Sequence, residues 1–231
     1  MNPFRYLLDL LFPPLCAGCR EVMDDANIAV CDKCKASLPI TEHATHHDNK
    51  VSGLFTNIPK VIHAAAFCHF DHENAIYNII HAIKYHNRPD AATWIGTQAA
   101  MHFQEKNPQW FMGIDFIFPI PLHRKRLGKR TYNQAELIAK GISSVTGIPV
   151  DTRHLLRRVN NKTQTLLSPQ QRKRNTEGIF YLSHAEELRG KHVLLVDDII
   201  TTGATMRSAV SVLTPVRGLT ISILTMGMAG N

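Results

Sequence analysis

The sequence predicts an α/β protein whose mostly parallel sheet is flanked by helices. Short apolar runs without alternation, such as residues 193–196, are typical of strands that are covered on both faces. Other segments place apolar residues at helical spacing, as do Ile76, Ile79, Ile80 and Ile83. Strands that alternate with helices favour a parallel sheet, and such sheets bind ligands at the carboxyl ends of their strands.

Composition limits the class of protein. The chain has 231 residues, 44% of them hydrophobic, which is enough to bury a core and excludes a disordered chain. Lys and Arg exceed Asp and Glu by seven. This excess indicates phosphate-bearing ligands or nucleic acid as partners.

The first fifteen residues include an apolar stretch, residues 4–15. Asp9 interrupts it, few basic residues precede it and no small-residue cleavage site follows, so it lacks the pattern of a signal peptide. No stretch reaches the roughly 18 apolar residues of a membrane-spanning helix. We expect a cytoplasmic protein without membrane insertion that begins with a short amphipathic helix at residues 4–12.

Four cysteines form two Cys-x-x-Cys pairs separated by eleven residues: Cys16, Cys19, Cys31 and Cys34. Four thiolates complete a tetrahedral shell around Zn²⁺, which leaves no position open for catalysis. Two disulfides or a redox site are the alternatives, but the chain lacks a secretory signal and a βα pattern behind the pairs. We therefore predict a structural zinc ribbon within residues 1–40. Cys68 stands alone and is expected to be a buried small side chain.

A polar segment follows the cysteines and contains His43, His46 and His47. These histidines could bind a metal, but a solvated loop is the favoured interpretation. We take residues 41–55 as a linker and residues 56–231 as the main domain.

The main domain is expected to begin with a strand at residues 61–70. The helix of Ile76 follows and ends at Lys84 and Tyr85. A second helix covers residues 91–104, and residues 114–121 form a strand that prolines end. Asn133 then predicts the N-cap of a helix with Glu136 as its capping partner.

The remaining elements complete the sheet. Residues 179–182 and 219–226 are expected to form strands that flank the strand at 193–196. Residues 204–213 are expected to form the crossover helix.

Between residues 114–121 and the helix of Asn133 the chain is strongly basic. Five cations fall within seven residues, namely Arg124, Lys125, Arg126, Lys129 and Arg130. A run this dense repels itself and favours an anionic partner, although a solvated basic face is the alternative. With Gly128 as a hinge, the run suits a lid that closes over a diphosphate. A second basic stretch spans residues 153–174.

Residues 193–205 read VLLVDDIITTGAT. Asp197 and Asp198 are expected where the strand leaves the sheet, and a turn that opens a helix follows them with Thr201, Thr202, Gly203, Ala204 and Thr205. The free N–H groups of a helix N-terminus bind anions, and threonine hydroxyls add donors. Two carboxylates suit sugar hydroxyls or a hard divalent cation. Together these features describe a site for a ribose 5-phosphate.

All thirteen of these positions resemble the phosphoribosyl diphosphate (PRPP) motif of type I phosphoribosyltransferases. The resemblance implies a type I phosphoribosyltransferase fold that binds PRPP with Mg²⁺. In that family the loop after the first core helix contacts the pyrophosphate of PRPP, and Lys84, Tyr85 and Arg88 resemble this loop. Arg130 is expected to contact PRPP from the lid.

Further motifs point to one family. The four-cysteine module, Arg130-x-Tyr132-Asn133-Gln134, the set Gln164, Leu167, Arg172 and Asn175, and the PRPP motif together resemble the competence protein F family. The resemblance covers essentially the whole chain. The family usually has glycine after the lid arginine, where this chain has Thr131. Its members are amidophosphoribosyltransferase-like and are associated with DNA uptake during natural transformation and with single-stranded DNA.

The resemblance implies two alternative functions. In one, Asp197 and Asp198 are catalytic, and the protein transfers phosphoribose to a nitrogen nucleophile and releases pyrophosphate. In the other, the protein is a non-catalytic or regulatory PRPP-binding accessory that handles single-stranded DNA alongside the DNA-uptake machinery.

Overall fold

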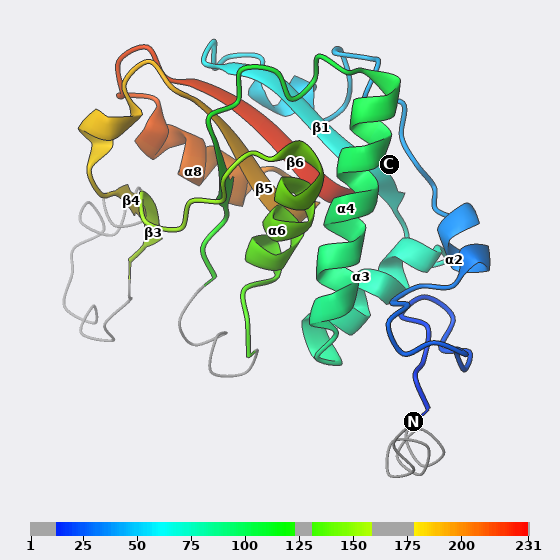
Figure 1. The fold of residues 1–231 in the computed structure, drawn as a ribbon. Coiled ribbons are helices and arrows are strands. Elements are labelled where there is room, and N and C mark those ends of the chain that lie inside the picture. Colours follow the sequence, from blue (N-terminus) through cyan, green and yellow to red (C-terminus); the bar gives the residue numbers. More distant parts are fainter. Residues whose placement is uncertain (1–12, 123–130, 159–177, 231) are drawn as a thin grey trace, which may run out of the picture.

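The computed structural model describes residues 13–122, 131–158 and 178–230 (Figure 1). Three predictions concern segments outside these described residues. They are the helix at 4–12, the basic lid with Arg130, and most of the second basic stretch.

Four parallel strands form the main sheet in the order β1-β6-β5-β2. They are β1 (Val61–Phe70), β6 (Thr220–Ala229), β5 (His192–Ile200) and β2 (Phe116–Pro119). The crossover helix α8 (Ala204–Leu213) joins β5 to β6, the two central strands. The predicted parallel α/β sheet is confirmed.

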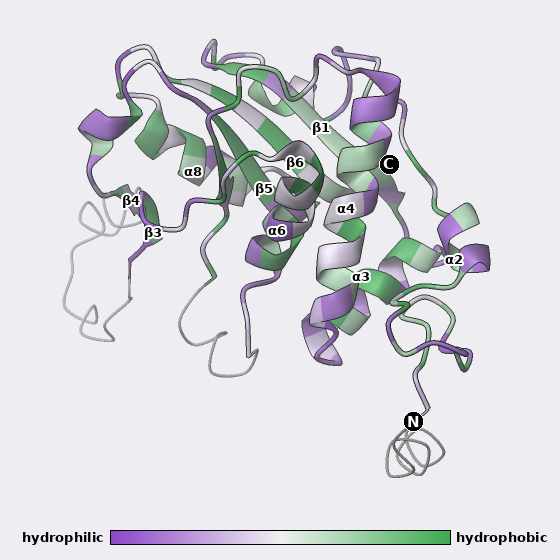
Figure 2. Cartoon of the chain, viewed as in Figure 1, coloured by the Kyte–Doolittle hydropathy of each residue, from purple (hydrophilic) through white to green (hydrophobic). Residues whose placement is uncertain are grey.

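Alternate residues of β5 belong to two separate hydrophobic cores. Leu194 and Val196 pack in the core of the helices α3 (Ala75–Tyr85), α4 (Pro89–Lys106) and α6 (Gln134–Thr146). Val193 and Leu195 pack in the core that contains α8. All four side chains are fully buried. Burial on both faces explains the run without alternation, and Figure 2 shows apolar strands between the two helical layers.

Helices α4 and α6 approach each other closely because each places a glycine at the contact. A Cβ atom on Gly96 would lie 2.1 Å from the Ile138 carbonyl oxygen, and one on Gly141 would lie 2.1 Å from that of Thr93. The two helices therefore form a tight layer on one face of the sheet (Figure 1). Among the helices that the structure describes, none combines the length and apolar character needed to cross a membrane.

Two strand predictions need correction. The strand β4 (Phe180–Leu182) does not flank β5 but pairs antiparallel with β3 (Leu155–Arg157) in a separate two-stranded sheet. Both hydrogen-bonding edges of β5 are already occupied, one by β2 and the other by β6. The predicted strand at 114–121 is shorter than expected, since β2 covers four residues.

The segment after the ribbon is packed, so the prediction of a solvated loop around His43 is wrong. His43 is 9% exposed, and its Nδ1 accepts a hydrogen bond from the Ala66 N–H at 3.2 Å. The Thr41 backbone N–H donates to the Phe67 carbonyl at 2.8 Å. Val51, which precedes the 3₁₀ helix η1 (Ser52–Phe55), and Phe55, its last residue, are also buried. These groups cover the open edge of β1, whose backbone would otherwise lack partners. The division into domains stays a prediction.

Candidate functional site

The sequence predicted that the strand would leave the sheet at its two acids. In the structure β5 instead continues past Asp197 and Asp198 to Ile200. Its pairing with β6 persists, since Asp197 lies opposite Thr225, whereas its pairing with β2 ends at Val196. Pairing with β6 decides the length of β5, and the motif at residues 193–205 does not include β6. Asp197 and Asp198 therefore lie along the edge of β5 that β2 has left.

The two carboxyl groups share one cationic neighbour. Asp198 Oδ2 lies 3.0 Å from Lys84 Nζ at the end of α3, with both side chains largely buried. Burial and then the neighbouring Asp198 raise the pKa of Asp197 to about 8, and the charges of Lys84 and Arg157 only partly offset this. Asp197 thus holds a proton at neutral pH, and ionising both acids requires additional positive charge.

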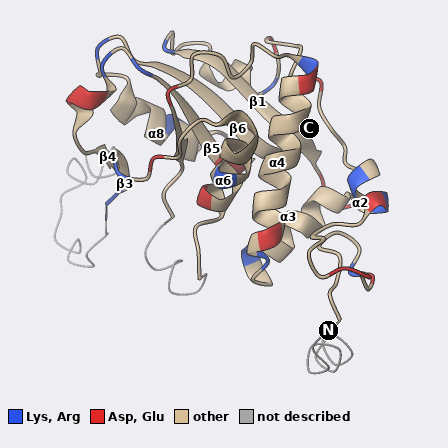
Figure 3. Cartoon of the chain, viewed as in Figure 1, with Lys and Arg blue, Asp and Glu red and all other residues tan. Residues whose placement is uncertain are grey.

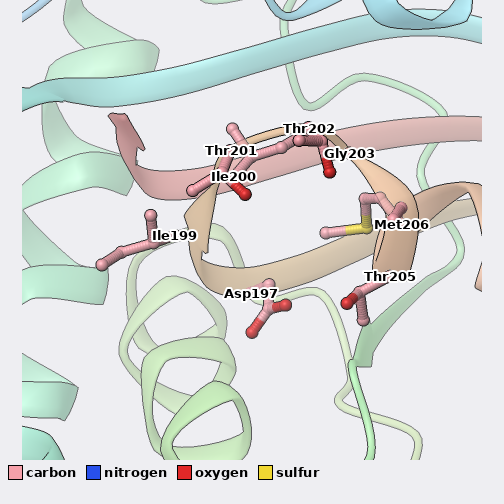
Figure 4. A pocket seen from close by; sticks show the side chains of 9 residues that line it. Asp197, Ile199, Ile200, Thr201, Thr202, Gly203, Thr205 and Met206 are labelled. Atoms are coloured by element: carbon pink, nitrogen blue, oxygen red, sulfur yellow. The ribbon is translucent and has the colours of Figure 1, made fainter. Parts of the chain in front are cut away.

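The turn after β5 encloses a small cavity of about 70 Å³, lined by Asp197 and residues 199–206. Figure 4 shows Asp197 and Thr205 on the same side of the turn, one from β5 and the other from α8. Gly203 is the N-cap of α8 with a φ of 72°, a conformation that favours glycine. The cavity holds more than the roughly 30 Å³ share of one water molecule and suits a small anion. The first N–H groups of α8 are available to that anion.

A larger cavity of about 400 Å³ adjoins the first and shares Asp197, Ile199 and Thr205 with it. Its further lining includes Lys84, Tyr85, Arg157 and Asp198. The structure therefore brings together three groups that are distant in the sequence: the end of α3, the acids of β5 and the threonine turn. An anion pocket and an acid pair thus open into one space large enough for a small-molecule ligand.

The three residues of the predicted pyrophosphate loop face two different parts of the molecule. Lys84 and Tyr85 face the larger cavity, and Tyr85 is 65% exposed. Arg88 does not join them, because its guanidinium donates to the carbonyl groups of Leu15 and Ala29. The structure thus places Arg88 against the ribbon, and its expected contact with pyrophosphate stays a prediction.

Two arginines at the site were not predicted to have a role there. Arg157 of β3 lines the larger cavity, and its guanidinium carbon lies 5.4 Å from the ring centroid of Phe180. Arg207 in the first turn of α8 donates to the carbonyl groups of Thr202 and Leu54, which fastens the threonine turn to η1. Arg157 appeared in the sequence only within a basic stretch, and no motif marked Arg207.

The residues that follow the lid lie against the turn between α3 and α4. Thr131 Oγ1 donates to Asn87 Oδ1 at 2.7 Å, and the Tyr132 hydroxyl donates to the Ile83 carbonyl at 2.7 Å. Asn133 is the N-cap residue of α6, as predicted, but its side chain caps no helical N–H and donates to the Ile120 carbonyl instead. Arg130 lies outside the described residues, so its contact with PRPP stays a prediction.

The four predicted zinc ligands converge at the other end of the chain. The Sγ atoms of Cys16, Cys19, Cys31 and Cys34 all lie within 4.8 Å of one another. The Cys19 and Cys31 sulfurs are 3.8 Å apart. A tetrahedron with zinc–sulfur bonds of about 2.3 Å has sulfurs about 3.8 Å apart, so the cluster fits structural zinc.

Backbone groups stabilise the thiolate of Cys16. Burial alone would raise its pKa, but hydrogen bonds from the N–H groups of Cys31, Cys19 and Gly18 outweigh it and lower the pKa of Cys16 to about 6. A Cβ on Gly18 would lie 2.7 Å from Cys34 Sγ, so glycine is needed here for space. Cys68 is buried apart from the cluster, as predicted.

Two family models match the chain. A double zinc ribbon domain matches residues 7–46, and a phosphoribosyl transferase domain matches residues 135–226. Solved structures resemble the chain loosely. A B. subtilis glutamine PRPP amidotransferase is 21% identical with a TM-score of 0.42, over 62% of this chain and 30% of that one. An adenine phosphoribosyltransferase from Leishmania tarentolae is 12% identical with a TM-score of 0.37, over 68% of this chain and 80% of that one.

The curated relatives of this chain are named for DNA utilization or for competence. The DNA utilization protein YhgH of Escherichia coli K12 is 27% identical over 137 residues, which are 59% of this chain and 60% of the relative. Competence protein F of Haemophilus influenzae is 38% identical over 92 residues, 39% of this chain and 40% of the relative. The matched part thus spans 60% or less of the length of these relatives. With its four-cysteine cluster, parallel sheet and both domain models, the chain belongs to the competence protein F family, which joins a double zinc ribbon to a phosphoribosyltransferase domain.

Proposed function

We propose that the protein binds Mg²⁺-PRPP and transfers its phosphoribosyl group to a nitrogen nucleophile. One observation carries the proposal: the anion-sized cavity at the N-terminus of α8 and the two acids of β5 open into the same larger cavity. A ligand in which a phosphate is joined to a sugar requires both an anion pocket and groups that bind the sugar hydroxyls, next to each other. Neither feature alone would suit the whole ligand.

Each part of PRPP has a proposed contact. The 5-phosphate occupies the turn of residues 201–205, and the ribose hydroxyls bind Asp197 and Asp198. The pyrophosphate lies beside Lys84 and Tyr85, with Arg130 as a further contact from the lid. Carboxylate oxygens are hard ligands that suit Mg²⁺ bound together with PRPP. The added positive charge would offset the cost of ionising both acids, which the raised pKa of Asp197 reflects.

The proposed reaction balances without a redox partner. The bond between C1 and the pyrophosphate oxygen breaks, and its electron pair leaves with pyrophosphate. The lone pair of the nitrogen nucleophile forms the new C1–N bond, and the nitrogen then loses its proton to solvent. Asp197 and Asp198 stabilise the positive charge that grows on the ribose ring, while Lys84 stabilises the leaving group.

A second candidate function is a PRPP-binding accessory that handles single-stranded DNA. It is favoured by the names of the relatives, which refer to DNA utilization and to competence. The net charge of +7 also suits an anionic polymer. In the view of Figure 3, however, charges of both signs are interspersed over the described residues.

Pyrophosphate release separates the two functions. We expect steady release from Mg²⁺-PRPP with one member of a panel of nucleobases and amines, and no release with Asp198→Asn. The accessory function predicts no release with any acceptor, together with oligonucleotide binding that weakens steeply as salt rises.

A further inference from the structure

The turn between α3 and α4 lies between the zinc ribbon and the proposed PRPP site. Just before this turn, at the end of α3, Lys84 Nζ lies 3.0 Å from Asp198 Oδ2. Four residues later, Arg88 precedes α4 and binds the ribbon. The residues that face the ligand cavity and those that face the ribbon therefore belong to one short segment.

A single guanidinium spans both knuckles of the ribbon. Arg88 Nη1 donates to the carbonyl oxygen of Leu15, which directly precedes Cys16, and Nη2 donates at 3.1 Å to that of Ala29, two residues before Cys31. Asp90 holds the guanidinium in place, since its carboxylate accepts from Nε at 2.9 Å and from Nη2 at 2.6 Å. Each accepting carbonyl thus lies within two residues of a cysteine of the cluster, so its position is expected to depend on how that cysteine is held.

Polar bonds join the ribbon to this turn in addition to the core that both share, to which Ala17 and Ala82 belong. A second bond joins Arg20 Nη2 to His86 Nε2 at 3.2 Å. Arg20 has a φ of 64°, so its backbone depends on the knuckle formed by Cys16 and Cys19. Among the described residues, Leu15, Ala17, Arg20, Ala82, His86 and Arg88 line a cavity of about 590 Å³ at this contact. The polar bonds at its rim therefore matter for the position of the turn.

The opposite side of the turn is fixed independently of the ribbon. Thr131 binds Asn87, and Tyr132 binds Ile83, so the start of α6 holds the turn there. The turn between α3 and α4 is thus supported from two sides, by the start of α6 and by the ribbon. Only the support from the ribbon is expected to depend on the four thiolates and a metal.

We propose that Arg88 is a positioning residue that couples the zinc ribbon to PRPP binding. When the ribbon loses its metal, Arg88 loses both carbonyl acceptors, the turn after α3 loosens together with the end of α3 that carries Lys84 and Tyr85, and the pyrophosphate is bound less tightly. Zinc loss or thiol oxidation would thereby lower PRPP affinity without altering Asp197 or the threonine turn. The PRPP part of this inference rests on the proposed function.

The test combines one substitution with zinc removal. Arg88→Ala is compared with wild type and with Lys35→Ala, which removes an exposed cation of the ribbon helix α2 (Asp32–Ala36). Mg²⁺-PRPP affinity is measured by calorimetry for each protein with zinc bound and after chelation and exchange into Mg²⁺ buffer. We expect about a tenfold loss of affinity for wild type and Lys35→Ala on zinc removal, because groups joined by one set of hydrogen bonds are energetically coupled. Arg88→Ala should be about tenfold weaker with full zinc content, and chelation should add less than twofold.

Three results would overturn the coupling. They are wild-type affinity in Arg88→Ala, a zinc effect in Arg88→Ala as large as in wild type, and loss of zinc from Arg88→Ala, which would make Arg88 a support of the ribbon alone. If Arg88→Ala does not fold, Arg88→Lys replaces it, since an ammonium group cannot span both carbonyls and Asp90.

Hydrogen exchange at residues 84–88 keeps this inference separate from the proposed function. Exchange there should become faster in zinc-loaded Arg88→Ala and in zinc-depleted wild type, but not in Lys35→Ala. If wild type binds no PRPP, the proposed function fails while this exchange pattern still supports the coupling. Unchanged exchange in Arg88→Ala overturns it.

Discussion

The zinc ribbon and the proposed PRPP site are held in opposite ways. Around the ribbon, apolar side chains such as Leu15, Val22 and Ile28 are 40%, 65% and 45% exposed. At the sheet, by contrast, residues 193–196 below the two acids are fully buried between two cores. We therefore expect the ribbon to depend on a bound metal for its conformation, whereas the fold builds the acid site before any ligand arrives.

The electrostatics of the two sites can be compared in the same way. At the ribbon, backbone N–H groups outweigh burial and lower the pKa of Cys16, whereas burial raises the pKa of Cys19 and of Cys34. At the acid site, burial and Asp198 raise the pKa of Asp197, so the fully ionised pair is destabilised. Both sites therefore gain from a cation, but we expect the ribbon to need it for assembly and the acid site for ligand binding.

Removing zinc is expected to have the largest effect. Structural zinc contributes on the order of 10 kcal/mol to small zinc domains, more than the exposed apolar side chains of the ribbon can replace. After chelation at neutral pH, residues 13–38 should lose hydrogen-exchange protection while β1, β5 and β6 keep theirs. Cysteine substitution with elemental analysis is the matched check. Cys16→Ser should lose zinc, and Cys68→Ala should retain it. Protection at 13–38 that persists without zinc would break the comparison.

Tight packing of the sheet domain predicts the next largest effect. Gly141→Ala would place a methyl group 2.1 Å from the Thr93 carbonyl oxygen, so α4 and α6 must separate. Overpacking of this kind costs typically about 1–3 kcal/mol of unfolding free energy. Urea unfolding should show this loss, while Gly53→Ala tests the effect of a glycine substitution where no atom lies within 4 Å and the backbone φ suits any residue. Equal stability of wild type and Gly141→Ala would show that the two helices are not fixed against each other.

The pH dependence of stability gives the smallest effect. Because the Asp197 pKa rises from 3.8 to about 8 on folding, the folded chain holds a proton that the unfolded chain lacks between these values. Stability therefore falls as pH rises through this window and levels off above it. Asp197→Asn removes this slope, and in PRPP-free protein its advantage over wild type should grow by about 1.3 kcal/mol between pH 6 and pH 7.

Asp115 provides a control of opposite sign for that experiment. Burial would raise its pKa, but hydrogen bonds from the His192 N–H and from Lys191 outweigh it and lower the pKa. Asp115→Asn should therefore lose stability at neutral pH, and this deficit should shrink as pH falls below the usual range of aspartate. Parallel curves for wild type and Asp197→Asn would contradict the raised pKa.

Much of the main domain could be predicted because its signals are local. The bounds of β1 and of α8 match their predictions, since apolar runs and helical spacing decide them. The cysteine spacing likewise predicted a cluster that converges.

Features that depend on distant partners could not be predicted. The extension of β5 past its acids depends on pairing with β6, and the burial of His43 depends on a backbone N–H 23 residues away. The strands β3 and β4, with three residues each, are too short to show a period. Arg207 fastens the threonine turn through contacts with Leu54 and Thr202 that leave no trace in the sequence pattern.

Calorimetric titration of Mg²⁺-PRPP tests the central claim most directly. Wild type should bind saturably, and Asp197→Asn and Asp198→Asn should each bind at least about tenfold more weakly, since hydrogen bonds to charged groups contribute about 1.5–3 kcal/mol. Asp115→Asn, at the amino ends of β2 and β5, should bind as wild type does. Equal affinity in wild type, Asp197→Asn and Asp198→Asn would contradict the account, because the acids of β5 would then hold no part of the ligand.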